Sequence, residues 1–278
     1  MTESKNCFKQ RVWQVTKVLL WYFFYQLVCT YGFFALNWVA TWLAGDGRVE
    51  IFTNNALLAA SLFLSALLMI WHLATFGYVK ISSRIFSEVS LSLLVKTTAL
   101  IFGSMYVLNV AMEWVALPDL MEDTFMEMAD EPLGVVSMAL LAPIVEEMMF
   151  RGAIQGYLMR RCSNAWTGII VTALIFGAIH MNPQQVVYAT LLGLIFGWIY
   201  YRTRSLLPVI VGHVLNNSVA VASMKIWGTE DIEAVTVDDK MMMVPFLLLI
   251  VAVLVPLVAN INRSLPAVPR PWHEKSED

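Results

Sequence analysis

Residues 133–159 read LGVVSMALLAPIVEEMMFRGAIQGYLM, an apolar run with two glutamates and one arginine near its middle. The run is longer than the roughly 20 residues that an α-helix needs to cross a bilayer. In lipid, only helices and closed barrels satisfy all their backbone hydrogen bonds, and this run lacks the alternation of a barrel strand. It therefore predicts a membrane-spanning helix that carries three charges at depth.

The rest of the chain has the same apolar character. Of its 278 residues, 59% are hydrophobic and 14% are charged, and the mean hydropathy is +0.67. A soluble domain usually has about 25% charged residues, so this composition excludes an ordinary soluble protein. The net charge of −3 gives no reason to expect nucleic acid as a partner. The three cysteines have no disulfide or metal-site spacing.

Further apolar segments predict a polytopic membrane protein. We expect an all-α helix bundle with about eight transmembrane helices, at residues 18–44, 56–78, 89–117, 133–159, 165–181, 185–201, 206–224 and 241–262. The spans divide the chain into an N-terminal region with three helices (1–132), a central four-helix core (133–224) and a C-terminal part (225–278). The last part would hold an acidic outer loop, the eighth helix and a charged tail.

The basic residues predict the orientation of this bundle. Thirteen of the 18 lysines and arginines fall on one side of the predicted spans, three fall on the other side, and two lie inside spans. The positive-inside rule then places both termini in the cytoplasm. The first span has no small-residue cleavage site, so we expect a retained anchor. With no organelle address, the expected location is a bacterial plasma (inner) membrane.

Ionisable side chains inside the spans point to a functional site. They are Lys96, Glu113, Glu146, Glu147, Arg151, His72, His180 and His213. A charge at the bilayer centre costs about 2.5–3.5 kcal/mol on insertion scales, so each of these side chains requires a partner or a function. Lys96 and Glu113 lie near span ends and can reach the interface. His72 is interpreted as a neutral, hydrogen-bonded packing residue.

The charges of the fourth span divide into two roles. Glu147 and Arg151 are four residues apart, so they share a helix face and are predicted to form an ion pair. Glu146 lies about 100° around the helix and is left facing another partner. Pro143 should bend the helix just before Glu146. An unpaired carboxylate at mid-membrane marks a functional site, although a packing network of all three charges is an alternative.

Two later spans add imidazoles and an amide. His180 follows Phe176 by four residues in the fifth span, and His213 and Asn217 share a face of the seventh span. With Glu146 they supply a base, its partner and oxyanion donors, which are the parts of a hydrolase that activates water.

The predicted depths of these residues agree only in part. Counted along the spans, Glu146 and His213 lie about 10 Å from the cytoplasmic edge of the bilayer, whereas His180 lies about 22 Å from it. Either the fifth helix begins below the membrane, or it tilts, or the link at residues 181–184 dips inward.

Three motifs carry a family resemblance: EExxxR at Glu146, Glu147 and Arg151, FxxxH at Phe176 and His180, and HxxxN at His213 and Asn217. In this order on successive helices they resemble the CPBP family of intramembrane proteases, also called the ABI or CAAX-protease-like family. That family includes the type II CAAX prenyl endopeptidases. The resemblance covers about residues 133–224, and no motif links the other spans to it.

The resemblance implies roles for the motif residues. Water would be activated by Glu146 and His180, and an oxyanion would be stabilised by His213 and Asn217. The supporting residues would be Glu147, Arg151 and Phe176. Zinc held by Glu146, His180 and His213 is an alternative. A metal-free mechanism is favoured, because an amide is a poor zinc ligand but a good oxyanion donor.

The expected activity is that of an intramembrane endopeptidase. Its substrates would be membrane-embedded, prenylated or leader peptides that approach from the cytoplasmic side of the bilayer. The sequence has no HExxH or GxSxG motif and no aspartate in a span, so it does not favour other intramembrane protease classes. The alternative is a non-catalytic immunity or scaffold protein that binds a membrane peptide. A transporter would require repeats or paired broken helices, which the sequence lacks.

Overall fold

The computed structural model describes residues 2–43, 53–79, 89–162, 164–228 and 240–268, and the regular elements in these ranges are all helical. This agrees with the predicted all-α class. The acidic loop expected at residues 230–239, the charged tail at 269–278 and the basic residues Arg48, Lys80 and Arg84 lie outside the described residues.

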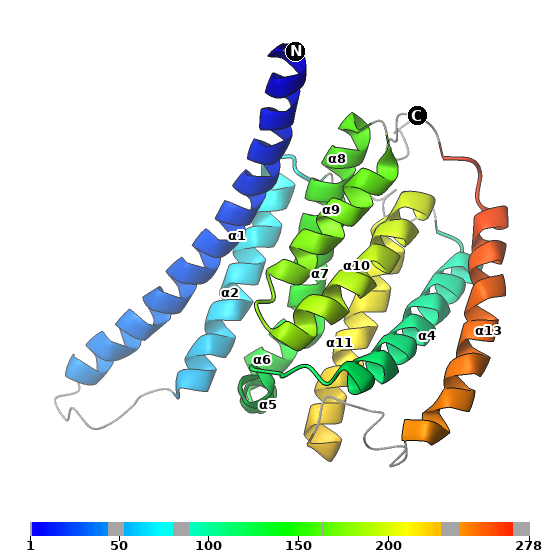
Figure 1. Cartoon of the computed structure of the whole chain (residues 1–278). Helices are drawn as coiled ribbons and strands as arrows, with labels where there is room; N and C mark the ends of the chain where they lie inside the picture. Colours follow the sequence, from blue (N-terminus) through cyan, green and yellow to red (C-terminus); the bar gives the residue numbers. More distant parts are fainter. Residues whose placement is uncertain (1, 44–52, 80–88, 163, 229–239, 269–278) are drawn as a thin grey trace.

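Seven helices are long and apolar enough to cross a membrane. They are α1 (Thr2–Leu43), α2 (Asn54–Thr75), α4 (Leu91–Val115), the continuous run Pro132–Arg161, α10 (Pro183–Thr203), α11 (Leu207–Trp227) and α13 (Lys240–Ser264). The predicted span 165–181 is instead the short helix α9 (Ala165–Ala178), with 14 residues. At 1.5 Å per residue it is about 21 Å long, shorter than a hydrocarbon core of about 30 Å, and α9 and α10 together return the chain to the end of the bundle where α8 ends (Figure 1).

The helices run side by side in alternating directions (Figure 1). α1 and α2 form one edge of the bundle, and α4 packs with α13 at the other edge. The beginning of α1 and the ends of α10 and α13 lie at one end of the bundle. The end of α4 and the short helix α5 (Glu122–Ala129) lie at the opposite end. At the first end, Arg202 of α10 donates to the carbonyls of Asn262 and Leu265, which caps the end of α13.

The central run is not one regular helix. It comprises α6 (Pro132–Val136), the π-helix η1 (Ser137–Leu141), α7 (Ala142–Glu147), the π-helix η2 (Met148–Gln155) and α8 (Gly156–Arg161). We predicted that Pro143 bends the helix just before Glu146, and the structure has a π-helix, η1, that ends at Leu141, two residues before Pro143. Proline lacks the N–H that would complete a regular turn, and wider π turns are one way in which a helix accommodates this.

Glycines allow the helices of the central region to approach closely. A Cβ atom at Gly193 of α10 would lie 3.2 Å from the Phe176 ring of α9, and one at Gly197 would lie 2.9 Å from Gln155 Oε1. On α9, a Cβ at Gly177 would overlap the Thr190 hydroxyl and lie 2.5 Å from the Val186 carbonyl oxygen. Gly193 and Gly197, which are four residues apart, therefore lie on a face of α10 that packs closely against its neighbours.

His72 has the predicted packing role. It is buried on α2, and its Nδ1 lies 3.1 Å from the Tyr25 hydroxyl of α1. Its ring also contacts the rings of Trp21 and Phe76, with centroids 4.8 and 4.5 Å away. These contacts pack α1 against α2.

Candidate active site

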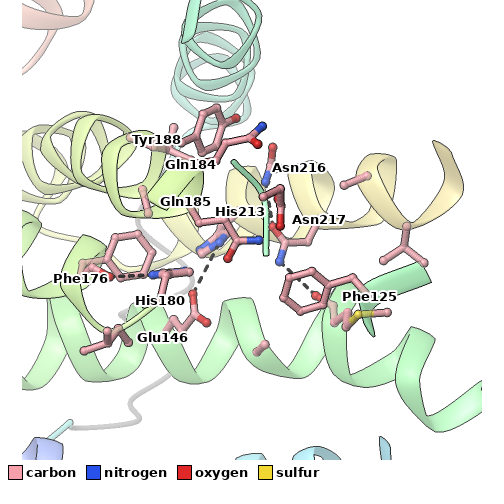
Figure 2. A pocket seen from close by; sticks show the side chains of 18 of the residues that line it. Phe125, Glu146, Phe176, His180, Gln184, Gln185, Tyr188, His213, Asn216 and Asn217 are labelled. Carbon is pink, nitrogen blue, oxygen red and sulfur yellow. Dashed lines mark hydrogen bonds and ion pairs between the residues drawn. The ribbon is translucent and has the colours of Figure 1, made fainter. Parts of the chain in front are cut away.

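A cavity of about 720 Å³ lies within the bundle and holds the predicted catalytic residues. It is lined by residues of α1, α2, α4, α7, α10 and α11 and by the end of α9. The predicted residues that face it are Glu146, Phe176, His180, His213 and Asn217 (Figure 2). Residues far apart in the sequence thus meet around one space large enough for a short peptide segment.

The register of the α8–α9 hairpin brings His180 to the cavity that Glu146 also lines. A Cβ at Gly168 would lie 2.9 Å from Met159 Cγ, so these two residues pack opposite each other in an antiparallel pair. Twelve residues further along each helix, this register reaches His180 on one side and Glu147 on the other. His180 and Glu146 line the same cavity, although the depths counted along the separate spans differed.

His180 is held by the end of its own helix. Its Nδ1 lies 2.8 Å from the carbonyl oxygen of Phe176, and its ring packs edge-on against the Phe176 ring. The last carbonyls of a helix have no intrahelical partner, and this side chain supplies one. Because a carbonyl only accepts, Nδ1 carries the proton and Nε2 has a free lone pair when the imidazole is neutral. The FxxxH spacing therefore positions a base.

Glu147 makes two contacts behind the cavity. Its Oε1 lies 3.1 Å from Arg151 Nη1, and both side chains are fully buried, so the predicted ion pair is present. The same oxygen lies 2.9 Å from His213 Nδ1. No local pattern indicated this second contact, because 66 residues separate the partners. Glu147 thereby fixes the ring of His213 so that Nε2 lies 3.8 Å from Glu146 Oε2.

Arg151 is bound by α10 and by two aromatic rings as well as by Glu147. Its Nη2 donates to the Gly193 carbonyl at 3.2 Å, and its guanidinium lies over the rings of Phe176 and Phe196, 4.6 and 5.2 Å from their centroids. Such cation–π contacts are stronger when they are shielded from water. One turn later, Gln155 repeats the pattern by donating to the Gly197 carbonyl at 2.8 Å. Our sequence analysis missed Gln155, a buried amide in the same charged span.

The amide of Asn217 is oriented by two neighbours. Its Nδ2 donates to the Met138 carbonyl in η1 at 3.1 Å, and its Oδ1 accepts from Asn216 Nδ2 at 2.8 Å. An amide nitrogen has two N–H donors, so one remains for a ligand in the cavity. Asn216 was missed, although the pair of adjacent amides in an apolar span was a signal.

Other polar residues of the cavity were also missed. They are Tyr22 and Gln26 on α1, Ser65 on α2, Asn109 on α4, and Gln184, Gln185 and Tyr188 on α10. Tyr22 and Gln26 hydrogen-bond to each other through their side chains, and they are four residues apart in an otherwise apolar span. Polar residues at helical spacing inside a span were therefore the usable signal.

The zinc alternative does not fit the residues present. Within the described part of the chain, no group of three or more His, Cys, Asp or Glu side chains is placed to hold a metal ion. Glu146, His180 and His213 all lie in that described part. Zinc needs such ligands together at about 2.0–2.2 Å.

The fold and the cavity define a polytopic helical membrane protein with a glutamate, two histidines and an asparagine facing one internal space. Residues 129–219 match the family model described as "Type II CAAX prenyl endopeptidase Rce1-like". This segment is similar to the Rce1-like type II CAAX prenyl endopeptidase (CPBP) family, which is the family that the motifs indicated.

A curated relative supports the same assignment. The chain is 30% identical over 90 residues to "Putative membrane peptidase YdiL" of Bacillus subtilis (strain 168). The aligned part is 32% of this chain and 36% of the relative, so the match spans about a third of each protein. No solved structure matches the chain.

Proposed function

We propose that this chain is an intramembrane endopeptidase that hydrolyses peptide bonds with a water molecule activated by Glu146 and His180. The observation that carries the proposal is the convergence of Glu146, His180, His213 and Asn217 on one cavity from three helices. The Rce1-like segment and the relative named as a membrane peptidase support the same reaction class. Membrane-embedded, lipidated or leader peptides are the proposed substrates.

The first step is an attack by water on the peptide carbonyl. The Glu146 carboxylate accepts a proton from water while the new C–O bond forms. His180, whose Nδ1 is engaged by the Phe176 carbonyl, offers Nε2 as a second acceptor. The proton then passes to the leaving nitrogen as the C–N bond breaks, which gives a carboxylic acid and an amine.

The tetrahedral oxyanion would be stabilised by donors on α11. Asn217 contributes the N–H that Met138 does not use. His213, when doubly protonated, donates from Nε2, and Glu147 carries the compensating negative charge at Nδ1. Donors fixed in advance in a site with little water stabilise developing charge more than mobile water does. Glu147, Arg151 and Phe176 would act as positioning residues.

The proposed setting is the inner membrane of a bacterium, with both chain termini in the cytoplasm. The distribution of basic residues along the sequence supports this orientation. Fusions of a cytoplasmic reporter to each terminus test it directly.

The test of function needs no guess about the substrate. Protein termini are compared across membrane and cytoplasmic fractions of cells that express the wild-type chain or Glu146→Gln at equal levels. We expect a set of new termini that disappear in the variant. Glu127→Gln, the same change on the exposed side of α5, should leave that set intact. If Glu146→Gln has unchanged termini and still complements a deletion, a peptide-binding immunity or scaffold role is correct instead.

A further inference from the structure

Two parts of the cavity wall meet at the turn between α9 and α10. One part is the α4–α5 connection, residues 116–121, together with α5, and it contributes Asp119 and Phe125 to the lining. The other part is the α9–α10 turn with the beginning of α10, and it contributes His180 and Gln184. These two parts are more than 50 residues apart in the sequence, so side-chain contacts must hold them together.

Asn182 joins the two parts through both ends of its amide. Its Nδ2 donates to Asp119 Oδ1 at 2.8 Å, and its Oδ1 accepts from the Leu120 N–H at 3.1 Å. Asp119 Oδ1 also accepts from the Met121 N–H at 2.8 Å, which orders the connection at three successive residues. Asn182 is 0% exposed and is not among the described residues that line the cavity. It therefore acts on the cavity through its neighbours.

The Asn182 side chain does not serve its own helix. The residue occupies the N-cap position of α10, where an asparagine side chain usually accepts from an N–H of the first turn. Within the described part of the chain, Asn182 makes no such side-chain bond. By contrast, Asn164 at the start of α9 accepts from the Trp166 N–H at 3.0 Å. The amide of Asn182 is thus used between elements instead of within one.

The backbone between His180 and Asn182 is strained. Met181 has a φ of 52°, in the left-handed region that residues other than glycine seldom adopt, and its side chain is 76% exposed. Such a conformation persists where the surrounding structure fixes it. On one side of Met181, the His180 ring is bound to the Phe176 carbonyl, and on the other side Asn182 is buried and doubly bonded. The position of His180 therefore depends on both anchors.

We propose that Asn182 is a positioning residue, which holds the α4–α5 connection against the turn that carries His180. Its loss would open the cavity wall at this point and release the turn. The effect on the base rests on the proposed function, whereas the closure of the wall does not. The experiment therefore measures the two effects separately.

An exchange of two side chains tests the contact. Asn182→Asp keeps the acceptor for Leu120 but places a carboxylate oxygen against Asp119. Combining it with Asp119→Asn gives the pair a donor again, in the reverse direction. Asn164→Ala is the control, because it removes a side-chain bond to the backbone at the other end of α9.

The first measurement needs no cleavage. A cysteine at Ser65, which is 4% exposed and lines the cavity from α2, is introduced after Cys7, Cys29 and Cys162 are replaced by alanine. Its labelling by a membrane-impermeant maleimide is followed in phosphatidylcholine nanodiscs. Asn182→Asp should label about tenfold faster, the change expected from loss of one hydrogen bond to a charged group. The exchanged pair and Asn164→Ala should label at the parent rate.

The second measurement is the cleavage of a peptide, well below the unfolding temperature of each variant. Because a displaced base affects the chemical step, Asn182→Asp should lower kcat about tenfold with a much smaller change in KM. The exchanged pair should recover kcat.

The outcomes separate this inference from the proposed function. Equal labelling of the parent and Asn182→Asp, or faster labelling that the exchange does not reverse, overturns the inference. Faster labelling with an unchanged kcat overturns the positioning of His180. The expected labelling order without cleavage by any chain supports the contact and counts against the endopeptidase. If Asn182→Asp does not fold, Asp119→Ala removes the same hydrogen bond, and labelling at the parent rate then overturns the inference.

Discussion

His213 Nδ1 lies 2.9 Å from Glu147 Oε1, and the other nitrogen of the same ring lies 3.8 Å from Glu146 Oε2. Two glutamates that are adjacent in the sequence therefore face opposite nitrogens of one imidazole. The fully buried partner, Glu147, is also bound to Arg151, whereas Glu146 faces the cavity. This arrangement separates a buried, ion-paired carboxylate from one that faces the cavity.

Removal of Glu147 should destabilise the protein. Glu147→Ala leaves Arg151 buried without its counter-charge, and loss of one partner of a buried pair costs about 3–5 kcal/mol. We expect a clearly lower unfolding temperature in detergent, measured by intrinsic tryptophan fluorescence. Glu127→Ala on the exposed side of α5 is the matched control and should unfold like the wild type. If Glu147→Ala and the control unfold at the same temperature, the structural role of the pair is refuted.

The phenol of Tyr22 should assist substrate binding from outside the Rce1-like segment. Tyr22 lines the cavity from α1, and Tyr22→Phe removes only its hydroxyl. A hydrogen bond contributes about 0.5–1.5 kcal/mol, so kcat/KM for a cleaved peptide should fall about two- to tenfold. Tyr31→Phe makes the same change on the same helix at a side chain that is 70% exposed, and it should have no effect. Equal rates for both variants would show that α1 does not contact the substrate.

The close approach of α9 to α10 should tolerate no methyl group at Gly177. A Cβ there would overlap the Thr190 hydroxyl and crowd the Val186 carbonyl, so Gly177→Ala should cost about 1–3 kcal/mol. It should also lower activity, because His180 follows three residues later. Gly32→Ala on α1 is the control, since no atom lies within 4 Å of the new methyl group. Helix propensity predicts that this control is neutral or slightly stabilising, and the unfolding temperatures of the two variants check both expectations.

Activity should survive metal chelators. Among the described residues, no group of three His, Cys, Asp or Glu side chains is placed to hold one metal ion, and the proposed reaction uses carboxylate, imidazole and amide groups alone. Cleavage by the purified chain should therefore continue at the same rate after treatment with EDTA and o-phenanthroline. A loss of activity that added zinc restores would contradict the metal-free mechanism.

Local spacing in the sequence was enough to predict the helices and several contacts within them. Long apolar runs predict membrane-spanning helices, because lipid offers no hydrogen-bond partner and a helix satisfies its backbone groups internally. The ion pair of Glu147 with Arg151 was also predictable, because residues four apart share a helix face whatever surrounds the helix.

Contacts between helices depended on the tertiary structure. The bond from Glu147 to His213 joins α7 to α11, and the register of the α8–α9 pair brings His180 to the cavity that Glu146 lines. Only the packing of α1 against the bundle brings Tyr22 and Gln26 to the cavity. The sequence thus determined which side chains share a helix face, whereas only the packing of α1, α9, α10 and α11 decided which faces meet. The physical reason is that the spacing along one helix is local, while the distance between two helices is set by side chains far apart in the chain.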